Sequence, residues 1–240
     1  MPLPAEDRQK ILEYCDRDLP SDGYVAGISN FIDDRILCER VQAEFYAARY
    51  IYKLGEALNV SDERLHAHVK FQIVQYASIY EAIIVYFLWE KYPAHPAVTD
   101  IEFHNVFKKA ASLPNNLQLL TTSGEDVTLC INVKQKTSRV SIKFDDKVDA
   151  AVKIGFVDET LGEEIKEFYK LRNAIHIESA IKNDIKYEIS SSQLAYRRIQ
   201  PFTKGIKGFL QTGRLPDDAR LRKPDETSAH AESAKENGEA

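Results

Sequence analysis

The sequence predicts a mainly α protein, an antiparallel helical bundle with an inserted β-hairpin and a disordered C-terminal tail. Three observations lead to this fold class. Apolar residues recur at helical intervals over long segments, a later stretch alternates apolar and polar residues as strands do, and the last residues have almost nothing to bury. The chain has 240 residues, of which 44% are hydrophobic and 29% charged, so it is long enough for a sizeable core.

The first two long helices are expected between residues 24 and 92. Apolar side chains follow a helical period from Tyr24 to Leu58, and a polar turn then interrupts it. Ser61 can cap a second helix, whose apolar stripe continues until Pro93 ends it. Two long helices joined by a short turn predict an antiparallel helical hairpin.

The second of these helices contains the long apolar segment FQIVQYASIYEAIIVYFLW. No membrane span is expected here, because Glu81 lies near its middle and a carboxylate at the centre of a bilayer is costly. No basic segment followed by an apolar one opens the chain, so a secretory signal is not expected. A cytoplasmic location fits best, because the cysteines are few, odd in number and far apart: Cys15, Cys38 and Cys130.

Neither a metal nor a cofactor is expected. The cysteines do not have the spacing of a zinc site, and His66 and His68 would point in different directions on a helix. Asp100, Glu102 and His104 share the spacing of a strand face, but they lie in a short connection and are interpreted as surface polar groups.

A β-hairpin is expected at about residues 117–144. Apolar and polar residues alternate from Val127 to Val133, and again from Val140 to Phe144 after the polar turn QKTS. The hairpin is therefore inserted between the helical segments. A short helix around Lys147 to Val152 is expected to follow it.

Two further helices complete the predicted bundle. Thr160 and Glu163 resemble a capping box, which would open a helix whose core face carries Phe168, Leu171 and Ile175. The serines at 190–192 would cap a last helix through Leu210, which Pro201 should kink and Gly213 should end. Residues 1–213 then form the helical domain, and residues 214–240 form a disordered acidic tail.

The charge of the chain is uneven. The formal net charge is −5, yet the stretch 190–214 contains basic residues and no acid. A local basic surface on an acidic protein is compatible with a phosphate partner. The residues predicted to contact RNA phosphates are Arg197, Arg198, Lys204 and Lys207.

The segment LRNAIH contains the strongest candidate for chemistry. Arg172, Asn173 and His176 would lie within about one turn of a helix, where a guanidinium, an amide and an imidazole converge. Arginine grips phosphate bidentately, and histidine exchanges a proton near neutral pH. Alternatively, His176 is a half-buried helix residue and Arg172 a solvated or salt-bridged one, since this spacing is common on helices.

Glu81 and Tyr169 are predicted to support this patch. Glu81 is the one charged residue in its apolar helix segment, so burial would require a partner, and Arg172 is the candidate. Tyr169 would share a helix face with Arg172. The alternative is that Glu81 lies on an exposed strip of its helix.

A helical bundle whose late helix carries LRNAIH resembles the HEPN superfamily, whose mark is an Arg, often followed by Asn, and then a His. The likeness covers residues 24–92 and about 160–210. Only three residues separate Arg172 from His176, fewer than is usual in the family, and the β-hairpin is an addition.

The resemblance implies a metal-independent endoribonuclease of toxin or antiviral-defence type, acting as a homodimer. In this chemistry the ribose 2′-oxygen attacks the adjacent phosphate. His176 would move the proton, Arg172 would stabilise the charged transition state, and Asn173 would orient the phosphate or the His. RNA is the expected partner, with an antitoxin or an effector-complex protein as a further one. Some HEPN proteins only bind, so a non-catalytic protein- or nucleic-acid-binding module is the alternative.

Overall fold

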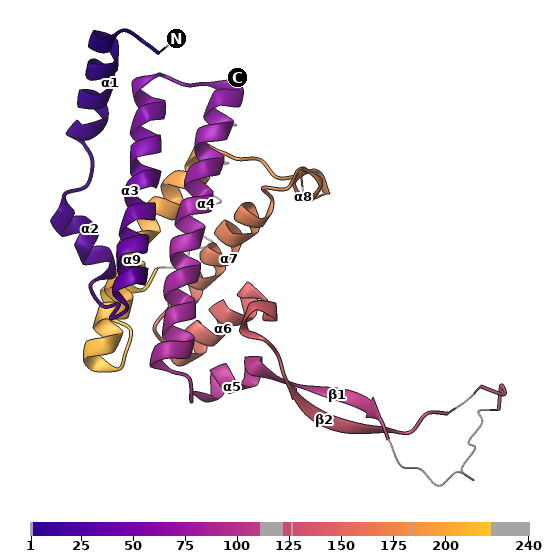
Figure 1. Cartoon of the computed structure of the whole chain (residues 1–240). Coiled ribbons are helices and arrows are strands. Elements are labelled where there is room, and N and C mark those ends of the chain that lie inside the picture. Colours follow the sequence, from indigo (N-terminus) through magenta and orange to yellow (C-terminus); the bar gives the residue numbers. More distant parts are fainter. Residues whose placement is uncertain (1, 111–121, 126, 183, 222–240) are drawn as a thin grey trace, which may run out of the picture.

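The structure is a computed structural model that describes residues 2–110, 122–125, 127–182 and 184–221. Its helices pack as an antiparallel bundle, from one end of which a two-stranded antiparallel β-hairpin projects (Figure 1). The predicted fold class is confirmed. The acidic tail expected from residue 214 lies outside the described residues after Leu221. Its first residues include the 3₁₀ helix Asp217–Ala219, and Ala219 is buried.

The centre of the bundle is the helical hairpin of α3 (Arg35–Ala57) and α4 (Asp62–Tyr86). The expected single helix from Tyr24 is in fact two, because α2 (Asp22–Ser29) precedes a break, and the Asp34 side chain caps α3 by accepting a hydrogen bond from the Leu37 N–H. The helix α1 (Ala5–Arg17) packs on α3 and was not predicted. A π-helical turn, Phe87–Lys91, extends α4 nearly as far as expected.

α4 lies in the middle of the core, where it packs against α3, α7 (Glu159–Asn173) and α9 (Ile189–Thr212) (Figure 1). Tyr76 and Tyr80 are fully buried, and the Tyr80 hydroxyl donates to the Ala195 carbonyl of α9 at 2.7 Å. The helix Asp62–Lys91 is long and apolar enough to cross a membrane, but 61% of its most apolar window is buried within the protein. Its apolar character is therefore explained by its central place in the bundle.

The inserted hairpin is confirmed, but its strands differ from those expected. β1 (Phe103–Lys109) pairs with β2 (Cys130–Lys136), and the helix α5 (Pro96–Glu102) leads into β1. The strand predicted for residues 140–144 is wrong. Ile142 and Phe144 are buried at the start of α6 (Phe144–Ile154), so their alternation marks a chain that turns into a helix. Part of the predicted hairpin, residues 117–121 and residue 126, lies outside the described residues.

Glu102, at the base of the hairpin, fixes it to the bundle. This carboxylate is 7% exposed and accepts a hydrogen bond from the Trp89 indole at 2.8 Å. Lys136 of β2 lies 3.2 Å from its other oxygen, and Arg139 lies 3.8 Å away. The interpretation of Glu102 as a surface group is therefore wrong, because three donors compensate for its burial.

The last helices hold the candidate site. Asp158 caps α7 by accepting hydrogen bonds from the N–H groups of Thr160 and Leu161, in place of the expected capping box. A short helix, α8 (Ile177–Lys182), follows α7. Gly213 ends α9 in the left-handed conformation, with φ of 71°, as the sequence predicts.

Candidate functional site at the end of α7

The helix α7 ends one residue after Arg172. Asn173 is its last residue and Ala174 its cap, so His176 lies in the turn that joins α7 to α8. The expectation that Arg172 and His176 share one helix face is therefore wrong. Ile175, expected in the core, is 41% exposed for the same reason.

Arg172 is held against α4 by Glu81. Its Nη1 donates to Glu81 Oε2 at 2.6 Å, and both side chains are roughly three-quarters buried, at 29% and 25% exposure. This is the pair that the sequence predicts. A guanidinium has five N–H donors, so Glu81 can fix its position and leave other N–H groups for a further acceptor.

Tyr169 lies between the same two groups. Its hydroxyl donates to Glu81 Oε1 at 3.3 Å, and the Arg172 guanidinium lies over its ring, 5.0 Å from the centroid. The ring stacks on Phe144 of α6, with 4.0 Å between centroids. Burial and the Glu81 charge raise the pKa of the Tyr169 hydroxyl, so it remains a donor at neutral pH. The structure thus brings Glu81, Tyr169 and Arg172 together.

Lys147 of α6 is a nearby cation that sequence reasoning missed. It is 6% exposed, and its ammonium group lies over the Trp89 ring, 5.7 Å from the centroid. Burial lowers its pKa, and the negative charge of Glu81 partly offsets this effect. Glu81 therefore balances two cations, Arg172 by direct contact and Lys147 through its charge. The sequence indicated only a short helix around Lys147, and no local pattern marked this lysine as a neighbour of Glu81.

The turn that carries His176 is tied to the bundle through its backbone. Lys70 of α4 donates to the Ile175 carbonyl at 3.0 Å, and the Tyr187 hydroxyl donates to the Leu171 carbonyl at 2.8 Å. The Tyr187 bond satisfies a carbonyl that the end of α7 leaves free, and the Lys70 bond fixes the turn beyond it. The His176 side chain is exposed, and no described residue binds its imidazole. It is therefore open to solvent or to a ligand.

Asn173 is exposed and lines an open hollow of about 740 Å³ beside α7. The hollow is polar and contains charges of both signs, because Lys166 is paired with Asp149 at 2.6 Å and with Glu163 at 2.7 Å. Asn173 contacts this hollow, whereas Arg172 faces α4. The three residues of the LRNAIH candidate thus occupy adjacent positions on different sides of the helix end.

The basic run of α9 is largely engaged within the protein. Arg198 Nη2 donates to Glu164 Oε1 of α7 at 2.7 Å, and Lys204 lies 2.5 Å from an oxygen of Asp218. Lys207 donates to the Gly27 carbonyl. Arg197 is exposed and has no ion pair with the described residues. Three of the four residues predicted to contact RNA thus already bind groups of the protein, with which a phosphate would have to compete.

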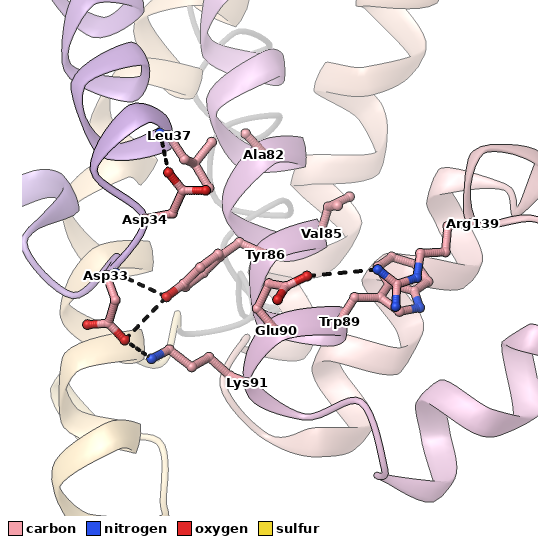
Figure 2. A pocket seen from close by; sticks show the side chains of 10 residues that line it. All are labelled: Asp33, Asp34, Leu37, Ala82, Val85, Tyr86, Trp89, Glu90, Lys91 and Arg139. Atoms are coloured by element: carbon pink, nitrogen blue, oxygen red, sulfur yellow. Dashed lines mark hydrogen bonds and ion pairs between the residues drawn. The ribbon is translucent and has the colours of Figure 1, made fainter.

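A second hollow, of about 720 Å³, lies at the C-terminal end of α4 and contains none of the predicted site residues. Figure 2 shows that four of its charged groups form two ion pairs, Lys91 with Asp33, and Arg139 with Glu90 at 3.8 Å. The Tyr86 hydroxyl also accepts the Asp33 N–H, at 3.0 Å. These contacts join the start of α3, the π-helical turn and the base of the hairpin, which indicates a structural role.

Comparisons of the chain with protein-family models, with curated proteins and with solved structures gave no match. The resemblance to the HEPN superfamily therefore rests on the LRNAIH segment and on the helical bundle.

Proposed function

We propose that the protein is a HEPN-like, metal-independent endoribonuclease whose site is the C-terminal end of α7. One observation carries this proposal. A fixed guanidinium, held by Glu81 and Tyr169, lies four residues from an exposed imidazole with no partner among the described residues. Arg172 is thus positioned in advance, and His176 is accessible, which are the properties that charge stabilisation and proton transfer require.

The chemistry follows from these groups. The ribose 2′-oxygen attacks the adjacent phosphorus, the bond from phosphorus to the 5′-oxygen breaks, and a 2′,3′-cyclic phosphate and a free 5′-hydroxyl form. His176 takes the proton of the 2′-hydroxyl, and Arg172 stabilises the extra negative charge on the phosphate oxygens. Asn173, which is exposed beside them, would orient the phosphate or the imidazole.

The leaving 5′-oxygen also needs a proton. It lies on the opposite side of the phosphorus from the 2′-oxygen, so one imidazole is poorly placed to remove the first proton and deliver the second. Two copies related by a two-fold axis would supply two His176 side chains, one as base and one as acid. The proposal therefore includes a homodimer whose two α7 ends face each other across the scissile phosphate. It also includes a cytoplasmic role in a toxin–antitoxin or antiviral-defence system, with an antitoxin or effector-complex protein as partner.

A non-catalytic HEPN-like binding module is the second candidate. The Glu81 carboxylate favours it, because it neutralises the guanidinium on which phosphate recognition depends. The position of His176 outside α7 favours it as well.

The products of a reaction with single-stranded RNA distinguish the two candidates. The protein is incubated with a labelled RNA in the presence of a strong chelator. We expect 2′,3′-cyclic phosphate ends, and no cleavage at a position where the substrate has a single 2′-deoxy ribose. An intact substrate at high protein concentration, or products with 5′-phosphate ends, would contradict the ribonuclease proposal.

A further inference from the structure

The β-hairpin has a composition unlike that of the rest of the chain. The strands β1 and β2, here called the arm, contain four lysines and no acidic residue, whereas the whole chain has a net charge of −5. Figure 1 shows that the arm extends away from the helical bundle, so neither of its faces is covered by a helix. The arm is therefore a basic surface on which Lys108, Lys109 and Lys134 have no ion pair with the described residues, whereas Lys136 is paired with Glu102 at its base.

The strand register places the aromatic residues of the arm on one face. Residues directly opposite each other in an antiparallel pair share a face, and side chains alternate between the faces along each strand. Phe103 is opposite Lys136, and Phe107 is opposite Asn132. We call this the aromatic face; its members are Phe103, Asn105, Phe107, Lys109, Cys130, Asn132, Lys134 and Lys136.

The contacts within the aromatic face agree with this register. The ammonium groups of Lys134 and Lys136 lie over the Phe103 ring, 5.2 and 5.6 Å from its centroid. Phe107 is 74% exposed and has room to stack on a planar group. The two phenyl rings are roughly 13 Å apart along the strand, given a rise of about 3.3 Å per residue.

The opposite face of the arm has a different character. It consists of His104, Val106, Lys108, Ile131, Val133 and Gln135. Val106 and Val133 are opposite each other and half-buried, and His104 forms a hydrogen bond of 2.7 Å with Thr137. This face contains no aromatic ring other than the bonded imidazole, so it provides matched control positions.

We propose that the aromatic face binds single-stranded RNA, with a base stacked on Phe107 and phosphates contacted by Lys109 and Lys134. An exposed ring flanked by lysines is a combination by which proteins hold single strands without a fixed sequence. Asn105 lies between the two rings along β1 and Asn132 lies opposite Phe107, and both side chains can donate to and accept from base edges. The choice of RNA over DNA rests on the proposed function, because RNA is its substrate.

The composition of the arm also argues against the other occupants. A two-stranded ribbon does not enter the deep, narrow major groove of an RNA duplex, which favours an unpaired strand. A protein partner that covered the aromatic face would have to supply acidic side chains for the lysines, because the strands of the arm contain none. The Glu102 contacts with Trp89, Lys136 and Arg139 anchor the base of the arm, so a bound strand would be held in a fixed relation to the bundle.

The test measures the affinity of the full chain for a fluorescently labelled, 2′-O-methylated RNA single strand, which cannot be cleaved by 2′-oxygen attack. Phe107→Ala is compared with Ile131→Ala, an exposed apolar residue of the opposite face, and Lys134→Ala with Lys108→Ala. We expect Phe107→Ala to weaken binding by about tenfold, from the loss of one stacked base, without changing the salt dependence. Lys134→Ala should reduce the slope of log affinity against log salt by about 0.7, the value for one phosphate contact on a single strand.

Equal effects of the two members of either pair, or no effect of any of the four, would overturn the proposal. It would also be overturned if Phe107→Ala left RNA binding unchanged but converted a dimer to a monomer in sedimentation, which would identify the arm as a protein contact. Thermal midpoints of all four variants control for folding. A protein that binds RNA through the arm but yields no cyclic phosphate products would contradict the proposed function alone. Cleavage that depends on Arg172 and His176 with normal binding by the arm variants would contradict the arm proposal alone.

Discussion

Arg172 and Glu81 lie 91 positions apart in the sequence, and their side chains meet at 2.6 Å. This pair was predictable, because a single carboxylate in an apolar helix needs a partner to be buried. The place of His176 was not predictable from the sequence. No glycine or proline marks the end of α7, and the bonds that help fix the chain there come from Lys70 and Tyr187, distant residues whose role no local pattern indicates.

Arg172→Ala is predicted to destabilise the fold by about 1–2 kcal/mol, because it leaves Glu81 partly buried without its cation. The estimate lies between the small contribution of exposed ion pairs and the larger cost of breaking buried ones. Urea unfolding followed by circular dichroism measures it. Lys170→Ala, which removes an exposed pair with Glu167 at 3.4 Å, is the control and should cost less than about 0.5 kcal/mol. Equal losses in the two variants would show that the Glu81 contact does not stabilise the fold.

Among the elements, the hairpin shows where the alternation of apolar and polar residues predicts a strand correctly and where it does not. The alternation around residues 127–133 correctly indicated β2, whereas the same alternation at 140–144 belongs to the buried start of α6. β1 was missed, because its sequence, FHNVFKK, has little apolar alternation and both of its faces are largely exposed. Glu102 was misjudged because its burial depends on Trp89, thirteen residues away, and on the returning strand.

Glu102 should make the anchoring of the hairpin dependent on pH. Burial opposes its charge, but the hydrogen bonds from Trp89 and Lys136 and the Arg139 charge outweigh this, so its pKa is lower in the folded protein than its ordinary value. A carboxylate whose pKa is lowered by folding stabilises the fold above its unfolded pKa, near pH 4, and this stabilisation is lost as the pH falls through the folded pKa.

Glu102→Gln, which removes the charge, should therefore lower the free energy of unfolding by about 1–2 kcal/mol at pH 7 and by much less at pH 3. Unfolding curves at the two pH values measure the difference. Glu90→Gln is the control, since Glu90 is 63% exposed and lies 3.8 Å from Arg139. If the difference in unfolding free energy between wild type and Glu102→Gln were larger at pH 3 than at pH 7, the proposed role of the Glu102 charge would be contradicted.

Arg197 and Arg198 of α9 are predicted to have different roles, RNA contact and stabilisation of the fold, which the sequence could not distinguish. Arg197→Ala should weaken RNA binding and flatten its salt dependence by about 0.7 in slope, because Arg197 is exposed and has no ion pair with the described residues. Arg198→Ala should instead destabilise the fold by about 1 kcal/mol or more, because its contact with Glu164 joins α9 to α7. Binding and unfolding measured on both variants test this division. A lower stability of Arg197→Ala together with an unchanged salt slope would reverse it.

For the whole molecule, the proposed chemistry requires more groups than one copy offers. We predict a homodimer with the two segments 172–176 facing each other, so that each scissile phosphate meets two histidines and two arginines. Sedimentation velocity at micromolar concentration should show a dimer. His176→Ala should leave the dimer intact, since the imidazole is exposed and packs little against the protein. A monomer alone, with RNA present, would remove the composite site.

The proposal that the end of α7 is a catalytic site is tested by measuring RNA cleavage by His176→Ala together with its thermal midpoint. The exposed His176 side chain packs little, so the substitution should leave the midpoint nearly unchanged while cleavage falls by a factor on the order of a hundred or more. His95→Ala, which changes a histidine outside the site, should retain full activity. Cleavage by His176→Ala at the wild-type rate, with the fold intact, would contradict the claim.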